Sequence, residues 1–374
     1  MTESTTTEEL LCIGNAIVDF FASAGEDFAR NHGITGESQH VEHGALMAAI
    51  AELPEKVSCS GGGAANVAKI AALLGMDASF VGAVGSAGPV GSAGPVGSAD
   101  RGDSLDDLGR FFEKELLDAG VRPILFPRGS PTGCCLTLEL PSPAGGEALI
   151  RAAAAPSASL ELVKEDIGEE AIRKAAVVVI DGYLMGRRDL VRHILDLANI
   201  SGTTVALDLG SPWIAAERAH EILTYSRVYP LILFMNESEA GAFYRTVNKY
   251  GPEGDETGED WEPGEEKTDF FLGLTANELF PIVVIKRGKR GALVFAGGNI
   301  HRESAFVVKP RDSTGAGDAF CAAFLAAWVR GKTLGECAVL GNKVAREVLS
   351  VPGTGVKRKK IAALGRTLGK TPVR

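Results

Sequence analysis

Two glycines followed by an aspartate form the segment of this chain best suited to chemistry. Thr314, Gly315, Ala316, Gly317 and Asp318 lead directly into the small, apolar run 319–328, whose spacing predicts a buried helix. A glycine turn at a helix start directs unpaired N–H groups and the positive end of the helix dipole at the space above it, which favours an anion there. An aspartate in that first turn either stabilises the helix end or acts as a general base beside an anion hole.

A second glycine segment also precedes a helix of small residues. Gly61, Gly62 and Gly63 are followed by Asn66, and the helix is expected to end at Gly75. A dinucleotide fingerprint requires a further glycine, and Asn66 follows instead. A Rossmann site is therefore not predicted.

Four apolar segments in the second half of the chain end in polar residues, namely Asp181, Asp208, Asn236 and Lys286. The segments alternate with helical patterns, which predicts a parallel sheet covered by helices on both faces. Ligands of such sheets bind at the C-terminal ends of the strands. Asn236 and Glu239 are either a helix cap or part of that site.

The elements that position these residues begin with an apolar strand over 10–13, which ends at Gly14. Asn15 and Asp19 follow it, four residues apart, either as turn residues or as ligand contacts. Strand patterns return from Val121, in the segments 132–140 and 148–151. Arg151 either faces a substrate or is an exposed strand arginine.

Composition excludes several classes of protein. The 374 residues carry a formal net charge of -10, which disfavours a nucleic-acid partner. Six cysteines without C-x-x-C spacing suggest reduced thiols and a cytoplasmic protein. The start of the chain has no signal-peptide pattern, and the most apolar stretch, 320–329, is too short to span a bilayer.

The segment from Asp312 to Phe320 resembles the second signature of the PfkB/ribokinase family of carbohydrate kinases, D-[ST]-T-G-A-G-D-x-F. The resemblance implies that Asp318 takes the proton from the attacking hydroxyl. It also implies that Gly315, Ala316 and Gly317 hold the transferring phosphoryl group, in agreement with the needs of phosphoryl transfer.

Two more segments resemble family elements that contact the substrate. The glycine segment is similar to the first signature, G-G-x-x-x-N, and 14–19 is similar to G-[NED]-x-x-x-D. The residues carried over as substrate contacts are Asn15, Asp19, Gly61, Gly62 and Asn66.

The resemblance also implies ATP and Mg²⁺. Residues 282–291 resemble the turn that packs near the nucleotide, and Asn236 with Glu239 matches N-x-x-E, which would hold Mg²⁺ through water. A monovalent cation such as K⁺ beside Asp312 is a further implication. The expected ATP contacts are Lys286, Gly288, Gly291, Thr314 and Asn342.

The resemblance covers about 10–352 and implies a ribokinase-like three-layer α/β/α sandwich with a mainly parallel central sheet and a small β-sheet lid. We expect the lid within 15–60 and 121–155. The other segments are a disordered lead-in (1–9), a flexible GSAGPV repeat insertion (86–104), an acidic insertion loop (250–269) and a basic C-terminal segment (353–374). Lid pairing in the family implies a homodimer.

The expected activity is ATP-dependent phosphorylation of a hydroxyl on a small sugar. An adenosine or other nucleoside kinase is the alternative, because Gly14-Asn15 with Asp19 resembles that branch equally well. Apolar lid side chains placed to stack on a purine would favour a nucleoside, and hydrogen-bond donors would favour a sugar. A catalytically silent ligand sensor is the third reading, which the retained base and anion hole disfavour.

Overall fold

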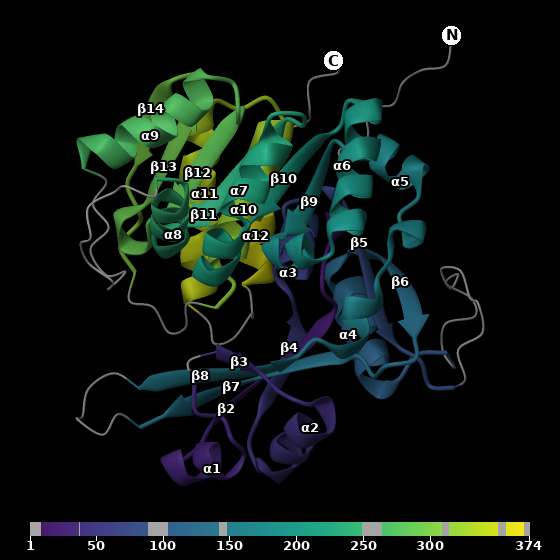
Figure 1. Cartoon of the computed structure of the whole chain (residues 1–374). Helices are drawn as coiled ribbons and strands as arrows, with labels where there is room; N and C mark the ends of the chain where they lie inside the picture. The colour runs from purple at the N-terminus through teal and green to yellow at the C-terminus, as the bar shows by residue number, and fades with distance from the viewer. Residues whose placement is uncertain are drawn as a thin grey trace.

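Short, apolar strands build the larger of two sheets. The computed structural model describes residues 9–36, 38–88, 104–141, 148–248, 264–308, 314–350 and 357–369. In this part of the chain the larger sheet has nine strands in the order β14-β13-β12-β11-β10-β9-β1-β5-β6, parallel except at β13 and β14 (Figure 1). Their bounds are β1 (Glu9–Ile13), β5 (Asp77–Gly85), β6 (Arg122–Arg128), β9 (Val177–Asp181), β10 (Thr204–Asp208), β11 (Leu231–Asn236), β12 (Ile282–Lys286), β13 (Ala292–Ala296) and β14 (Asn299–Glu303).

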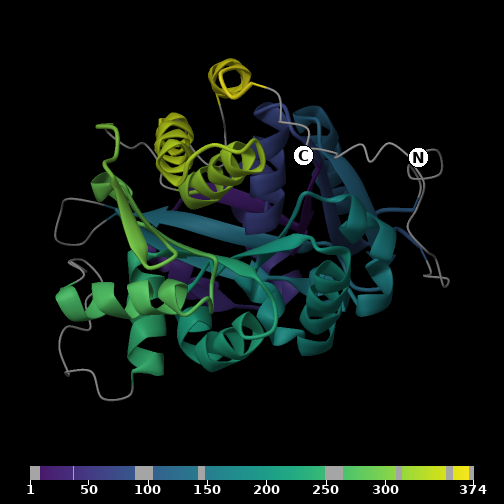
Figure 2. The ribbon, with the colours of Figure 1, turned by 90° about the horizontal axis from the view of Figure 1, so that it is seen from above.

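Helices cover both faces of this sheet (Figure 2). Alternate strand residues enter separate cores: Leu10 and Cys12 pack on one side, Leu11 and Ile13 on the other. The first side is covered by α3 (Gly63–Leu73), α4 (Asp107–Ala119), α10 (Ala316–Val329), α11 (Leu334–Leu349) and α12 (Arg358–Arg366). The second is covered by α5 (Glu169–Lys174), α6 (Arg188–Ser201), α7 (Pro212–Ser226), α8 (Glu237–Val247) and α9 (Glu265–Ala276). The predicted three-layer architecture is confirmed.

The smaller sheet has five strands in the described chain, ordered β3-β8-β7-β2-β4. Its bounds are β2 (Ile17–Ser23), β3 (Ser38–His40), β4 (Val57–Gly61), β7 (Gly133–Leu140) and β8 (Leu149–Ala155). The helices α1 (Glu26–Asn31) and α2 (His43–Glu52) lie on the face that points away from the large domain (Figure 1). Val18 and Phe20 are buried towards the core that includes α2, whereas Ile17, Asp19 and Phe21 are half-buried on the opposite face.

The structure corrects several boundaries drawn from the sequence. Within 121–155, where lid segments were expected, β7 and β8 belong to the smaller sheet, whereas β6 joins the larger sheet through β5. Residues 265–269 were expected in the acidic loop, but they start α9, where Glu265 and Glu266 suit the positive end of the helix dipole. Most of the GSAGPV insertion lies outside the described residues. The basic C-terminal run starts α12. Among the helices that the structure describes, none is both long and apolar enough to cross a membrane.

Candidate active site

The glycine turn and Asp318 form the start of α10. Gly315 precedes the helix with φ 74° and ψ 0°, a left-handed conformation that glycine adopts without strain. The backbone N–H of Ala319 donates to the carbonyl of Gly315 at 2.9 Å, which closes the first turn. Asp318 therefore lies in the same helical turn as the free amide groups of the N-terminus, as the sequence predicted.

Asp318 contacts a residue from the other glycine segment. Asn66, in the first turns of α3, donates from Nδ2 to Asp318 Oδ2 at 2.8 Å. Burial raises the pKa of Asp318 to about 6, and the charge of Asp208 adds to this increase, whereas Asn66 and Lys286 oppose it. Asp318 is thus ionised near neutral pH but poised to accept a proton.

Lys286 is held beside the glycine turn by a carboxylate. Its Nζ donates to both oxygens of Asp208 at 2.7 Å, across the intervening strand β11. A Cβ added to Gly317 would lie 3.3 Å from the same Nζ. Burial lowers the pKa of Lys286, but Asp208 and Glu239 outweigh that effect and raise it, so the side chain stays cationic. The turn therefore has a fixed positive charge next to its amides.

Asn236 and Glu239 form a reciprocal cap at the start of α8. Glu239 accepts from the backbone N–H and from Nδ2 of Asn236, each at 2.8 Å, and its own N–H donates to Asn236 Oδ1 at 2.8 Å. Burial raises the pKa of Glu239 to about 7, while Lys286 lowers it. The cap reading is therefore observed, and the cap lies beside the charged cluster of Lys286 and Asp208.

No group of three or more His, Cys, Asp or Glu side chains suited to direct metal binding occurs among the described residues. Mg²⁺ at phosphate sites keeps several waters and needs only one or two carboxylates. The carboxylates of Asp208 and Glu239 suit such an ion, in company with phosphate oxygens. Asp312, the expected neighbour of a monovalent cation, lies outside the described residues.

Asp19 reaches the site from the smaller sheet. Its carboxylate lies against Gly61, where a Cβ would overlap it, so only glycine permits this approach. Burial raises the pKa of Asp19 to about 7, Lys69 lowers it and Asp318 raises it. Gly62 precedes α3 and lies against the carbonyl of Asn15. The two family elements predicted to bind substrate therefore meet at one place.

Asn15 has a partner that the sequence did not reveal. Its Oδ1 accepts from Arg187 Nη2 at 2.7 Å, and Nη1 of the same arginine donates to the carbonyl of Ser159 at 2.5 Å. The charge of Arg187 also opposes the burial that raises the pKa of Asp181 to about 6. Arg187 has no motif around it, because it follows a short 3-10 turn (Gly182–Gly186) after β9.

Lys69 is the second residue that sequence reasoning missed. It lies one turn beyond Asn66 on α3, and its Nζ donates to Ser60 O at 2.5 Å and to Ser60 Oγ at 3.0 Å. Its charge lowers the pKa of both Asp19 and Asp318. The i, i+3 spacing from Asn66 was the signal that could have identified it.

The structure places Arg151 away from this site. On β8 it is paired with Leu138, on the face opposite to Asp19. Its guanidinium donates to Glu26 Oε1 at 2.8 Å and to the carbonyl of Ile34 at 3.1 Å. The prediction that Arg151 contacts substrate is therefore corrected, since the register of β8 directs this side chain to α1.

The remaining predicted nucleotide contacts come from three separate segments of the chain. Gly288 starts a 3-10 turn (Gly288–Arg290), and the carbonyl of Gly291 closes it by accepting from the N–H of Arg287 at 2.7 Å. Asn342, buried on α11, donates to the carbonyl of Ser304 at 3.1 Å. Thr314 directly precedes the glycine turn.

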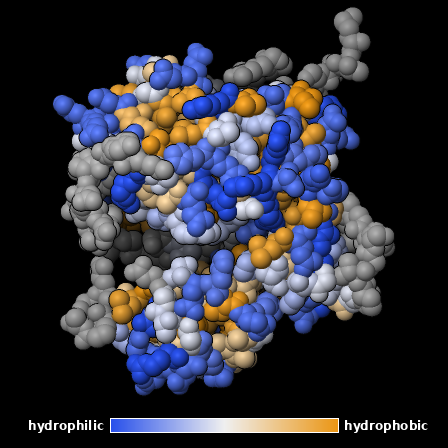
Figure 3. All heavy atoms as spheres, in the orientation of Figure 1, coloured by the Kyte–Doolittle hydropathy of each residue, from blue (hydrophilic) through white to orange (hydrophobic). Residues whose placement is uncertain are grey.

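The face of the smaller sheet that carries Asp19 is largely apolar. Asp19 is in register with Cys59 on β4 and Cys135 on β7, and Cys135 is paired with Ala154 on β8. Phe21 lies two residues along the same face. The space-filling view shows a hollow between this sheet and the large domain (Figure 3). On this face a bound molecule would meet one carboxylate and several small or apolar side chains, together with the polar Thr137 and His40, which the register places on the same face.

Comparisons with known proteins agree with this geometry. A family described as "pfkB family carbohydrate kinase" matches residues 105–361. The chain belongs to this family. It is therefore a PfkB kinase, a phosphotransferase, and the resemblance found in the sequence is confirmed.

Relatives of this PfkB kinase act on different substrates. A 5-dehydro-2-deoxygluconokinase of Listeria monocytogenes is 25% identical over 301 residues, 78% of this chain and 80% of its own length. A cytidine kinase of Thermococcus kodakarensis is 48% identical over 71 residues, only 18% of this chain and 25% of its own. The solved adenosine kinase of Sinorhizobium meliloti has a TM-score of 0.77 and 25% identity, covering 98% of this chain and 100% of its own, which confirms the ribokinase-like fold.

Proposed function

We propose that this PfkB kinase transfers the γ-phosphoryl group of ATP to a hydroxyl of a small sugar, with Asp318 as the general base. One observation supports the proposal above all. Asp318 lies where three groups come together: a hydrogen-bond donor from α3, the amide turn at the start of α10 and the lysine of β12. Phosphoryl transfer requires this kind of positioning and charge stabilisation.

The proposed reaction begins with the sugar hydroxyl close to Asp318. As its oxygen forms a bond to the γ-phosphorus, the proton moves to the carboxylate of Asp318 and the bond from phosphorus to the β–γ bridging oxygen breaks, releasing ADP. The amides of Gly315, Ala316 and Gly317 would stabilise the charge on the transferring oxygens, with Lys286 beside them.

Asp19 would hold the other hydroxyls of the substrate, together with Asn15, Gly61, Gly62 and Asn66. A carboxylate on one side and an amide on the other select a molecule with several hydroxyl donors. Bound Mg²⁺ would supply positive charge to the phosphates, with Asp208 and Glu239 as its carboxylate neighbours through water. Lys286, Gly288, Gly291, Thr314 and Asn342 remain the proposed ATP contacts.

A nucleoside is the second candidate acceptor, and the sheet face beside Asp19 favours it. Phe21, Cys59, Cys135 and Ala154 offer an apolar surface to a planar base, while Asp19 could still bind the ribose hydroxyls. The relatives named as adenosine and cytidine kinases support this candidate.

The decisive experiment is ADP release from MgATP over ketoses, aldoses, sugar acids, sugar phosphates and nucleosides, with Asp318→Asn assayed alongside. Turnover on one class that is lost in the variant would support the proposal and identify the acceptor. ATP binding without turnover on any compound would favour the ligand-sensor reading. The six free thiols support a reducing, cytoplasmic compartment for either activity.

A further inference from the structure

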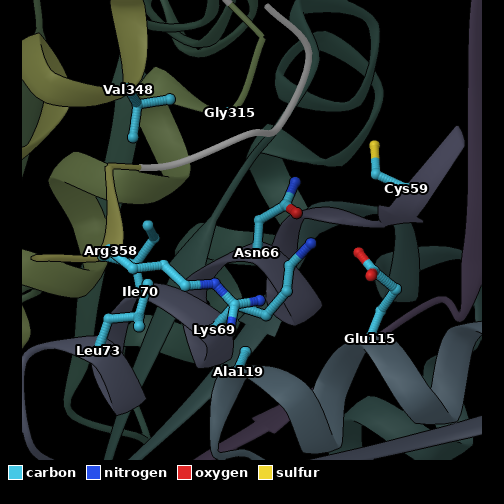
Figure 4. A pocket seen from close by; sticks show the side chains of 10 residues that line it. All are labelled: Cys59, Asn66, Lys69, Ile70, Leu73, Glu115, Ala119, Gly315, Val348 and Arg358. Carbon is cyan, nitrogen blue, oxygen red and sulfur yellow. The ribbon is translucent and has the colours of Figure 1, made fainter. Parts of the chain in front are cut away.

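A cavity of about 210 Å³ lies between α3, α4 and α12, next to the proposed active site. Asn66 and Gly315 border it on the catalytic side, and Figure 4 shows Lys69, Glu115 and Arg358 directed into it from three different helices. Apolar side chains such as Ile70 and Leu73 line the rest. A cavity of this size has room for roughly seven water molecules or one small organic solute.

Lys69 places a cation deep in this cavity. Ser60 accepts two of its hydrogen bonds, which leaves one of the three N–H groups of the ammonium without an acceptor among the described residues. Burial lowers the pKa of Lys69, which shows that its surroundings do not fully compensate the charge. An anion in the cavity would provide the missing charge and acceptor.

Arg358 brings a second cation to the rim. One guanidinium nitrogen donates to the carbonyl of Asp118 at 2.5 Å, and its other N–H groups have no acceptor in the described part of the chain. Arg358 also starts α12, whose first turn has three basic residues and no acidic one. Positive side chains are unfavourable at the positive end of a helix dipole, and a bound anion would offset that cost.

Glu115 faces these cations from α4. No hydrogen bond or ion pair of its carboxylate is found among the described residues, although its charge raises the pKa of Lys69. A ligand held between the two cations would therefore also need a hydroxyl or other donor for Glu115.

We propose that this cavity is a second binding site, adjacent to the proposed sugar and phosphoryl sites and bordered by Asn66 and Gly315 on that side, for a small hydroxylated organic anion with a phosphate or carboxylate group. The anionic group would lie between Lys69 and Arg358, and a hydroxyl group would donate to Glu115. Because Asn66 borders both the cavity and Asp318, the ligand would be coupled to the catalytic base.

Thermal unfolding of the full chain with two probes tests the site. Glycerol 3-phosphate represents phosphate esters and malate represents hydroxycarboxylates, each compared with KCl at equal ionic strength. At least one probe is expected to raise Tm saturably, by about 2–5 °C. Arg358→Gln and Lys69→Met should each abolish the rise. Lys359→Gln, the next basic residue on α12 and not part of the lining, should retain it.

Two active-site variants show where the probe binds. Lys286→Met alters the anion hole and Asp19→Asn alters the sugar site, and both should still respond. Loss of the response in either of these variants, with Arg358→Gln unaffected, would place the probe in the active site and overturn the proposal. An equal response in all variants, or none in the wild type with either probe, would overturn it as well.

Discussion

Asn66 donates a hydrogen bond to Asp318 at 2.8 Å, although 252 positions separate the two residues in the chain. This bond joins the first turns of α3 and α10, and each helix follows a glycine turn that belongs to one of the two family signatures. Because a hydrogen bond to the ionised carboxylate favours that form, Asn66 lowers the pKa of Asp318 against the larger effect of burial, which raises it.

Replacing the base should remove turnover and keep the fold. We expect Asp318→Asn to lower kcat by about 10²–10⁴-fold, since asparagine has a similar shape and cannot accept the proton. Steady-state ADP release measures the effect, and retained ATP binding shows that the site is intact. Unchanged turnover in this variant would exclude Asp318 as the base.

The pH profile should report the pKa of Asp318. With a value of about 6, kcat/KM is expected to fall by about tenfold for each pH unit below that point, because the protonated acid cannot act as a base. Asn66→Ala should move this limb to higher pH, since the lost hydrogen bond no longer favours the carboxylate. Asn199→Ala, an exposed asparagine on α6, should leave the limb in place.

The same carboxylates should reduce stability at high pH. Burial raises the pKa of Asp19 to about 7 and that of Asp318 to about 6, above their usual value of 3.8. The folded state therefore binds more protons than the unfolded state between pH 4 and these values, and stability falls as pH rises through them. Asp318→Asn should raise the free energy of unfolding at pH 8 by on the order of 1–2 kcal/mol.

Denaturant unfolding at two pH values tests that prediction. The gain of Asp318→Asn should shrink as the pH approaches 4, because the wild-type carboxyl is then neutral in the folded state and becomes increasingly protonated in the unfolded state as well. A gain that is equal at pH 8 and pH 4.5 would show that charge burial is not its origin.

The sequence indicated which residues meet at the proposed catalytic centre better than it indicated their surroundings. Four of these residues lie in segments where glycines or strand ends indicate a ligand site, and the structure brings the four together: Asp318, Asn66, Asp19 and Lys286. Arg187 was missed because an isolated cation after a turn has no local pattern, and Lys69 was missed because its one local signal is the i, i+3 spacing from Asn66. Ser60 lies on the strand that directly precedes the helix of Lys69, whereas Asn15 is 172 positions from Arg187 and becomes its neighbour only in the folded chain.

The sequence also did not determine on which face of the sheet a given strand residue lies. A shift of one residue in register exchanges the two faces of a sheet. The segment around Arg151 is rich in alanine, so its pattern did not indicate which face is buried. The pairing of Arg151 with Leu138 fixes the face on which Arg151 lies, and on that face its guanidinium donates to Glu26.

Arg151 should therefore affect stability and not catalysis. Arg151→Ala loses the half-buried ion pair with Glu26 and the bond to the carbonyl of Ile34, and we expect a loss of about 1 kcal/mol in the free energy of unfolding. KM for the acceptor should stay within about twofold, a difference of less than 0.5 kcal/mol. Glu26→Gln should show the same pattern. A large rise in KM for Arg151→Ala alone would return this residue to the substrate site.

Gly61 should be intolerant of even one methyl group. A Cβ there would overlap the carboxylate of Asp19, which must then move from its position near the charges of Lys69 and Asp318. We expect Gly61→Ala to lower kcat/KM for the acceptor by about 10–100-fold, because a small displacement of a positioning group is costly in catalysis. Gly129→Ala is the matched control, since a Cβ at Gly129 meets no atom within 4 Å. Activity that survives in both alanine variants would mean that Asp19 does not bind the substrate from the position described.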